Sequence, residues 1–321
     1  MAYIVFDLEW NQSPDGKNGS NRKLPFEIIE IGAVKLNEEM EIVDRFQCLI
    51  RPKVYKWIHN SIREVIHMNY RELKNGVPFP QAMERFLNWC GPAPVFFTWG
   101  SQDLTELQRN MKYYDMLGLL KGPILYYNVQ KLFGIAYETR KSCRSLEYAI
   151  DYLKIEKWMD FHRALADAYY TAEVLRKMDA KDIFPNSSID IYQNPKSKKE
   201  EVHICYPTYD KYVSREFSAR ENVMRDREVS STRCPVCKKP AKRKIRWFLC
   251  GSKNYYSVSI CEEHGLVKGK SRVRKAESGN YYAVKTIKLI SKEEAEEIRD
   301  KRDSLRQKRQ LKKRNSGKIV S

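Results

Sequence analysis

The chain has 321 residues, its composition is 42% hydrophobic and 12% aromatic, and its formal net charge is +18. This length favours two or three domains, and the apolar content is enough for a sizeable core. No apolar run approaches the length of a membrane span, and no charged region with a cleavage site opens the chain. We therefore expect neither a transmembrane helix nor a signal peptide, and a cytoplasmic protein.

The positive charge is unevenly distributed along the chain. Lysine and arginine balance aspartate and glutamate over residues 1–190, so residues 191–321 carry the whole +18. A neutral front half and a basic back half indicate a polyanionic partner, most simply nucleic acid. The alternative is that the charge only keeps the protein soluble and ends in a disordered basic tail.

The first predicted elements in chain order are strands. Residues 3–11, YIVFDLEWN, have period 2 and begin apolar on both faces, which is typical of a central strand covered on each side. Residues 26–36 and 42–50 are also strand-like and are joined by a short polar turn. The three strands should therefore form an antiparallel meander.

Strands and helices alternate after the meander. Strands are predicted at residues 93–100 and 124–129, and helices at residues 77–91, 103–117, 145–155 and 162–178. This alternation predicts an α/β fold with a mixed sheet flanked by helices. In such sheets, functional sites lie at the carboxyl ends of the strands.

Three acidic residues fall at such positions. Asp7 and Glu9 lie on one face of the first strand, about 6–7 Å apart, and two carboxylates at the edge of a core repel each other unless a cation lies between them. Asp103 follows a buried strand. With Glu106 it also matches a capping box, and Ser101 is another candidate for the helix cap.

A fourth acid and a histidine lie in the last predicted helix. Asp167 is on the small, apolar side of that helix, where an acid needs a partner. Its position near a helix N-terminus would also be favourable without one. His162 opens the helix, and by itself it is compatible with a structural or solvent-facing role.

In order, the pattern is Asp7-x-Glu9, then Asp103 after a buried strand, then His162-x4-Asp167 opening a helix. It resembles the DEDDh (DnaQ-like) 3′–5′ exonucleases, which have a ribonuclease H-like fold. The phrases FDLEW, EIIEIGAVKL, FTWGSQDL and HRALADA are most similar to the exoribonuclease branch that includes the Eri-like and KapD-like proteins. The resemblance covers about residues 1–180. The sister class has tyrosine four residues before the last aspartate, where this chain has Arg163, so the histidine version matches.

The resemblance implies that the four acids hold two Mg²⁺ or Mn²⁺ ions, which prefer oxygen ligands. Two such ions about 3.5–4 Å apart can clamp the attacking and leaving oxygens of a phosphodiester. His162 would take the proton from the attacking water. Trp10 or Trp99 could stack on the terminal base, although both are equally suited to the core.

We expect an exonuclease domain over residues 1–182 and a linker with a short exposed helix over residues 183–231. The linker stretch is polar, contains prolines and has few residues able to form a core. Residues 293–321 are acidic first and basic later, which suits the macrodipole of a helix that frays into disorder. That tail would be available for phosphate contacts.

Residues 232–292 contain a metal-binding pattern. Two ligand pairs separated by twenty-three residues, the spacing of a structural zinc site, are formed by Cys234, Cys237, Cys261 and His264. The β-rich stretch between the pairs could form the hairpin of a zinc ribbon, and Cys250 within it is the main alternative ligand. Free thiols paired by chance are the other interpretation. We expect one Zn²⁺ in a basic, zinc-ribbon-like β module.

The leading hypothesis is a metal-dependent 3′–5′ exonuclease that hydrolyses terminal phosphodiesters and releases 5′-mononucleotides. Its basic zinc module would capture the nucleic acid, and the resemblance alone favours RNA. The alternatives are a DNA-directed 3′–5′ exonuclease, and a non-catalytic regulator on the same fold that binds nucleic acid or protein. A regulator would be expected to have lost a carboxylate, and this chain keeps all five site residues. A ribosome or another protein is a further candidate partner for the basic half.

Overall fold

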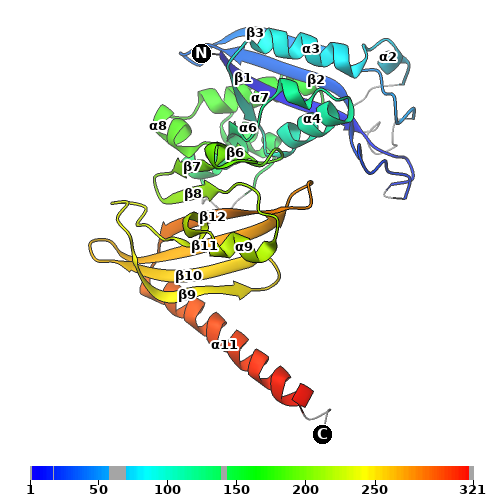
Figure 1. Cartoon of the computed structure of the whole chain (residues 1–321). Helices are drawn as coiled ribbons and strands as arrows, with labels where there is room; N and C mark the ends of the chain where they lie inside the picture. The colour runs from blue at the N-terminus through cyan, green and yellow to red at the C-terminus, as the bar shows by residue number, and fades with distance from the viewer. Residues whose placement is uncertain (1, 17, 58–69, 139–142, 318–321) are drawn as a thin grey trace. The chain divides into compact units, whose positions relative to one another are not determined.

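The computed structural model describes residues 2–16, 18–57, 70–138 and 143–317. The chain divides into two compact units, Met1–Gln193 and Asn194–Ser321, each with its own six-stranded sheet (Figure 1). No helix in the described ranges has the combination of length and apolarity needed to cross a membrane.

The first unit is built on a mixed sheet. Its strands are β1 Ala2–Asn11, β2 Glu27–Leu36, β3 Ile42–Leu49, β4 Pro94–Thr98, β5 Ile124–Asn128 and β6 Ser188–Asp190, in the order β3-β2-β1-β4-β5-β6. The first three strands form the predicted antiparallel meander. β4 runs parallel to β1, β5 runs parallel to β4, and β6 closes the edge antiparallel to β5. β1 is therefore a central strand, as predicted.

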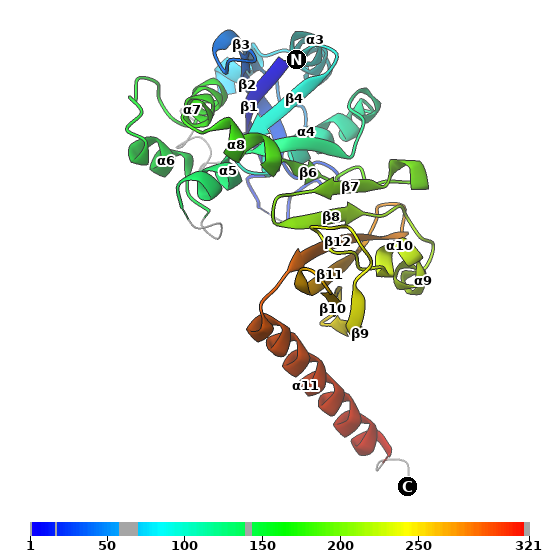
Figure 2. The same cartoon turned by 90° about the vertical axis from the view of Figure 1, so that its left-hand side faces the viewer.

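Helices cover both faces of this sheet (Figure 2). They are α2 Tyr70–Lys74, α3 Phe79–Cys90, α4 Gln102–Tyr113, η1 Leu117–Leu119, α5 Val129–Ala136, α6 Leu146–Tyr152, α7 Ala164–Arg176, α8 Ala180–Ile183 and η2 Phe184–Asn186. Ile4, Phe6 and Leu8 of β1 pack in a core with α3 and α4. Val5 packs on the other face in a core with α5, α6 and α7. This arrangement confirms the predicted α/β class.

The second unit is built on a wholly antiparallel sheet. Its strands are β7 Val202–Cys205, β8 Tyr209–Val213, β9 Lys242–Cys250, β10 Asn254–Cys261, β11 Gly265–Lys275 and β12 Tyr281–Leu289, in the order β7-β8-β12-β11-β10-β9. Its helices are η3 Lys198–Glu200, α9 Arg220–Arg225, α10 Arg227–Ser230 and α11 Lys292–Gly317. The β9–β10 hairpin lies between the two halves of the predicted zinc motif.

The structure differs from the expectation of a linker over residues 183–231. The beginning of this stretch completes the first unit through β6, and the later part enters the second sheet as β7 and β8. Tyr212, Val223 and Val229 from this stretch pack in a core with residues of β11 and β12. Short strands that are covered on one face need few apolar residues, so their polar composition concealed them.

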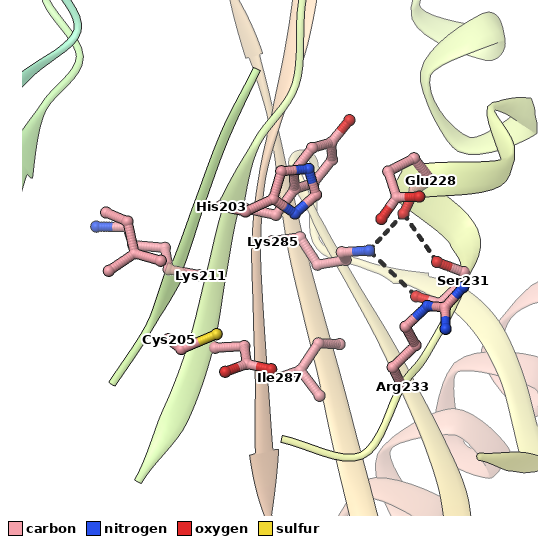
Figure 3. Close-up of a pocket in the computed structure, with 11 residues that line it drawn as sticks. His203, Cys205, Lys211, Glu228, Ser231, Arg233, Lys285 and Ile287 are labelled. Carbon is pink, nitrogen blue, oxygen red and sulfur yellow. Dashed lines mark hydrogen bonds between the residues drawn. The ribbon is translucent and has the colours of Figure 1, made fainter. Parts of the chain in front are cut away.

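Short helices close one face of the second sheet. Lys285 of β12 is buried there and donates hydrogen bonds to the backbone oxygens of Glu228 and Ser231 (Figure 3). Burial lowers the pKa of Lys285 to about 8. The indole of Trp247 donates to the backbone oxygen of Ser230 at 2.8 Å. These hydrogen bonds fasten α10 to the sheet and leave a cavity of about 90 Å³ beside Lys285.

The helix α11 begins against the opposite face. Ala295 and Ile298 pack in a small core with Ile245 of β9 and Val258 of β10. Most side chains of the following turns are exposed up to Leu311. The basic tail therefore forms a long helix fastened at its acidic end. Residues 318–321, where fraying was expected, lie outside the described residues.

Candidate active site

The five predicted site residues line one cavity of about 410 Å³ in the first unit. β1 supplies Asp7 and Glu9 near its carboxyl end, and Asp103 and Asp167 lie in the first turns of α4 and α7. His162 precedes α7 by two residues. Side chains separated by more than 150 residues in sequence are therefore brought to one edge of the sheet, where the fold class predicts a site.

Three carboxylates gather closely. One oxygen each from Asp7, Glu9 and Asp167 lies within 4.8 Å of the other two. Asp167 Oδ1 is buried and has no hydrogen-bond partner among the described residues. A buried carboxylate oxygen without a partner is costly, and a cation would satisfy it.

Burial and repulsion raise the pKa of all four acids. The pKa of Glu9 rises to about 8, and that of Asp7 lies well above its ordinary value. The pKa of Asp103 rises to about 7 and that of Asp167 to about 6. Burial is the largest cause at each residue, and neighbouring carboxylates add to it. The positive charge of Arg163 opposes the rise in the pKa of Glu9 only in part. The oxygen-only donors of the cluster suit a hard divalent cation.

Asp103 does not act as the helix cap that the sequence allowed. Ser101 occupies the cap position without a side-chain hydrogen bond to the helix. Glu106, the other half of the proposed capping box, instead pairs with Arg109 at 2.5 Å. The Asp103 carboxylate accepts hydrogen bonds from its own backbone N–H and from that of Leu8, and these oppose the rise in its pKa. Asp103 is therefore directed toward β1 and the other acids.

Gly32 sets the distance between β2 and the helix α7. It pairs directly with Asp7 across the β1–β2 ladder. A β-carbon at this position would lie 2.0 Å from the Leu165 nitrogen and 2.1 Å from the Ala164 carbonyl carbon. Because only glycine permits this contact with the first turn of α7, it brings Asp167 close to Asp7.

His162 lies in an unusual backbone conformation at the start of α7. Its φ is +64°, in the left-handed region that non-glycine residues rarely adopt. Its side chain is exposed on the cavity, and its backbone N–H donates to the carboxylate of Asp167. The Tyr170 hydroxyl anchors the preceding segment, accepting from the Met159 N–H at 2.8 Å and donating to the Met159 oxygen at 2.9 Å.

An ion pair between the buried Glu30 and the partly exposed Arg163 holds the segment on the other side of His162. Arg163 Nε and Nη2 donate to the two carboxylate oxygens of Glu30 at 3.1 and 3.0 Å, and Gln47 donates to the same carboxylate at 2.6 Å. Glu30 is fully buried and faces Glu9 across the ladder. Sequence reasoning missed this pair, although an acid in the apolar middle of β2 was a signal that a partner was needed.

The two tryptophans also line the cavity and pack partly into the core. The Trp10 ring lies 6.0 Å from that of Phe26, and the Trp99 ring lies 6.2 Å from that of Phe133. Trp99 Nε1 is buried without a hydrogen-bond partner among the described residues. Each ring therefore contacts the core on one side and lines the cavity on the other.

A sequence model of the RNase_T family, described as exonuclease, matches residues 4–175. The chain belongs to the RNase_T exonuclease family. No curated protein sequence matches it. Among solved structures, the nuclease domain of 3′hExo, a DEDDh family member bound to rAMP, is 20% identical with a TM-score of 0.50, over 59% of this chain and 96% of that one.

Two further structures resemble this RNase_T exonuclease. A 3′-exonuclease solved for 3′-end specific recognition of the histone mRNA stem-loop is 19% identical with a TM-score of 0.48, over 59% of this chain and 90% of that one. Cell-death related nuclease 4 is 17% identical with a TM-score of 0.47, over 64% of this chain and 68% of that one. The family match together with the 3′hExo nuclease domain confirms the predicted ribonuclease H-like fold and the prediction of an exonuclease.

The RNase_T exonuclease has a second cluster outside the matched region. Ligand atoms that lie within 4.8 Å of one another come from Cys234, Cys237, Cys261 and His264. Cys237 Sγ and His264 Nδ1 each lie 3.6 Å from Cys261 Sγ. Hydrogen bonding to His264 lowers the pKa of Cys261 to about 6, which favours the thiolate that binds metals. Cys250, the alternative ligand, lies at the end of β9 and is not part of this cluster.

Proposed function

We propose that the chain is a metal-dependent 3′–5′ exonuclease of the Eri-like and KapD-like branch, that it prefers RNA, and that it releases 5′-mononucleotides. The observation that carries the proposal is the cluster of Asp7, Glu9 and Asp167 around the unpaired Asp167 Oδ1. The 3′ polarity and the preference for RNA are supported by the similarity to the nuclease domain of 3′hExo, which was solved bound to rAMP.

The four acids Asp7, Glu9, Asp103 and Asp167 would hold two Mg²⁺ or Mn²⁺ ions. When bound, these ions supply positive charge to the phosphate oxygens of the scissile bond. His162 takes the proton from the attacking water, since an exposed imidazole is suited to proton transfer near neutrality. Trp10 or Trp99 holds the terminal base by stacking, which does not read sequence.

The second unit would bind one structural Zn²⁺ through the three cysteines and His264. It would also capture the nucleic acid, because its residues carry all of the formal charge of +18. The eight cysteines form no disulfide in the structure and suit a reducing compartment, so we place the protein in the cytoplasm.

The test is digestion of 5′-labelled single-stranded RNA and DNA of one sequence with Mg²⁺, by the intact protein and by Asp167→Ala. Progressive shortening from the 3′ end, faster for RNA and absent in the variant, supports the proposal. Faster shortening of DNA would favour a DNA-directed exonuclease. Tight binding of either strand without cleavage would favour a non-catalytic regulator.

A further inference from the structure

One face of the second sheet gathers cations from three neighbouring strands. Alternate residues of a strand point to the same side, so the four cations of β11 at even positions from Lys268 to Arg274 share one face. The register places Lys288 of β12 opposite Lys268 and carries Lys211 of β8 onto the same side. We call this side the basic face. Its cations are Lys211, Lys268, Lys270, Arg272, Arg274 and Lys288.

Most of this charge has no nearby carboxylate. The strand residues that the register places on the basic face include no aspartate or glutamate. Lys268 and Lys288 share a single acid, Glu294 of α11, at 2.7 and 3.1 Å. Lys270 and Arg272 are exposed, and their side chains form no hydrogen bond or ion pair with any described residue.

Two further cations on this face are unfavourably placed in the absence of an anion. Burial lowers the pKa of Lys211, and the positive charge of Arg274 lowers it further. Arg274 Nε is buried and has no hydrogen-bond partner among the described residues. An anion between or beside these groups would relieve their repulsion and satisfy the unpaired donor.

On the opposite face of the same sheet, two cations have hydrogen-bond or ion-pair partners. Lys285, next in sequence to Thr286 of the basic face, donates to two backbone oxygens, and Lys238 pairs with Asp210 at 2.8 Å. Figure 3 shows the amines of Lys211 and Lys285 directed to opposite sides of the sheet. The folded unit therefore pairs these cations on one side of the sheet and leaves Lys270 and Arg272 available on the other.

The row suits one extended strand of nucleic acid. Alternate residues of β11 are about 6.8 Å apart, a pitch comparable to that of successive phosphates along an extended chain. The register places the half-buried Tyr256 beside the exposed Lys270, so an aromatic ring flanks the row there, whereas Tyr282, beside Arg274, is buried. A positive surface interleaved with aromatic side chains is typical of single-strand binding.

We propose that the basic face binds a single-stranded segment of the RNA substrate, with successive phosphates along β11. This inference rests on the proposed function, since it names the surface that captures the substrate of the nuclease. It gives the second unit a defined binding surface, separate from the zinc cluster, with the first turn of α11 at its Lys268 end.

The test measures binding of a 5′-fluorescein single-stranded RNA by fluorescence anisotropy, with the full chain carrying Asp167→Ala to prevent cleavage. The test pair is Lys270→Ala with Arg272→Ala. The matched control is Lys253→Ala with Lys275→Ala, which removes two exposed cations flanking the same strands. The salt slope is about −0.7 per phosphate contact, so losing two contacts should reduce the slope by about 1.4 and weaken binding roughly 25-fold at 0.1 M salt.

Three outcomes decide between the interpretations. A selective loss in the test pair, larger for single-stranded RNA than for a blunt duplex, supports the proposal. Equal effects in the test and control pairs overturn it, and so does an equal loss for the duplex. Cleavage by the same variants without Asp167→Ala is measured in parallel. If these variants cleave RNA but the test pair does not weaken binding, the proposed role of the basic face is refuted and the proposed function is not.

Discussion

Replacing Glu9 by glutamine should stabilise the metal-free protein near pH 8. The Glu9 carboxyl has its pKa raised from 4.5 to about 8 in the folded chain, chiefly by burial and then by Asp167 and Glu30. Between these pH values the folded chain keeps a proton that the unfolded chain loses. The stability of the metal-free protein should therefore fall as the pH rises through this window.

The size of the effect follows from the shift. One pKa unit corresponds to about 1.4 kcal/mol, so at pH 7 Glu9 destabilises the metal-free fold by about 3 kcal/mol. For a unit of this length that is roughly 6–12 °C in melting temperature. Glutamine keeps the shape and has no charge to bury, so Glu9→Gln should remove most of this term. It should also weaken the stabilisation by Mg²⁺, because one proposed ligand is lost.

The assay is thermal unfolding followed by circular dichroism from pH 5 to 8.5. The protein is dialysed against buffer without Mg²⁺ and without a chelator, so that zinc is retained, and is then measured with excess Mg²⁺. Glu39→Gln, at an exposed position of the same unit, is the matched control. A wild-type melting temperature that does not change with pH, or parallel curves for Glu9→Gln and Glu39→Gln, would refute the electrostatic reasoning.

Four further predictions concern the other parts of the molecule. His162→Ala should slow turnover by about 10²–10⁴-fold with calorimetric Mg²⁺ affinity unchanged, and a lost affinity would give His162 another role. Arg163→Ala should lower the free energy of unfolding by about 3 kcal/mol, the lower end of the range for a buried ion pair because Arg163 is partly exposed. Arg163→Lys should recover part of this loss, and an unchanged urea midpoint in Arg163→Ala would contradict the prediction. Cys234→Ser should release about one zinc per chain and unfold only the second unit, whereas fresh protein without zinc by elemental analysis would contradict the site. A fragment ending at Gln193 should match the full chain in turnover at low salt and saturating RNA but bind with a shallower salt slope, and equal slopes would assign the basic half another partner.

The first unit could be predicted from the sequence because its signals are local. The strand that carries Asp7 and Glu9 begins apolar on both faces, which indicates that both are covered. Asp167 lies on an apolar helix face, where its carboxylate needs a partner. The order of these motifs was sufficient for the resemblance. The ion pair between Glu30 and Arg163 joins residues 133 positions apart, and only the packing of α7 on β2 brings them together.

The second unit was harder to predict for a physical reason. β7 and β8 are short and contain polar residues such as His203 and Lys211, because only part of each strand is covered. β7 pairs only with β8, and the other partner of β8, β12, lies about 70 residues further along the chain. No local window contains the apolar residues that complete this core, so composition alone indicates a linker.

The contact at Gly32 has a consequence for the choice of metal. Asp7 and Asp167 come from a strand and a helix whose separation is limited by the absence of a side chain at this position. Mg²⁺ requires oxygen ligands at about 2.0–2.1 Å in a nearly octahedral arrangement, whereas Ca²⁺ accepts longer bonds and looser geometry. A methyl group at residue 32 would push the first turn of α7 outward and widen the carboxylate cluster, shifting its preference toward larger ions. In the proposed metal site, ion selectivity would then depend partly on Gly32, which has no side chain to contact the ion.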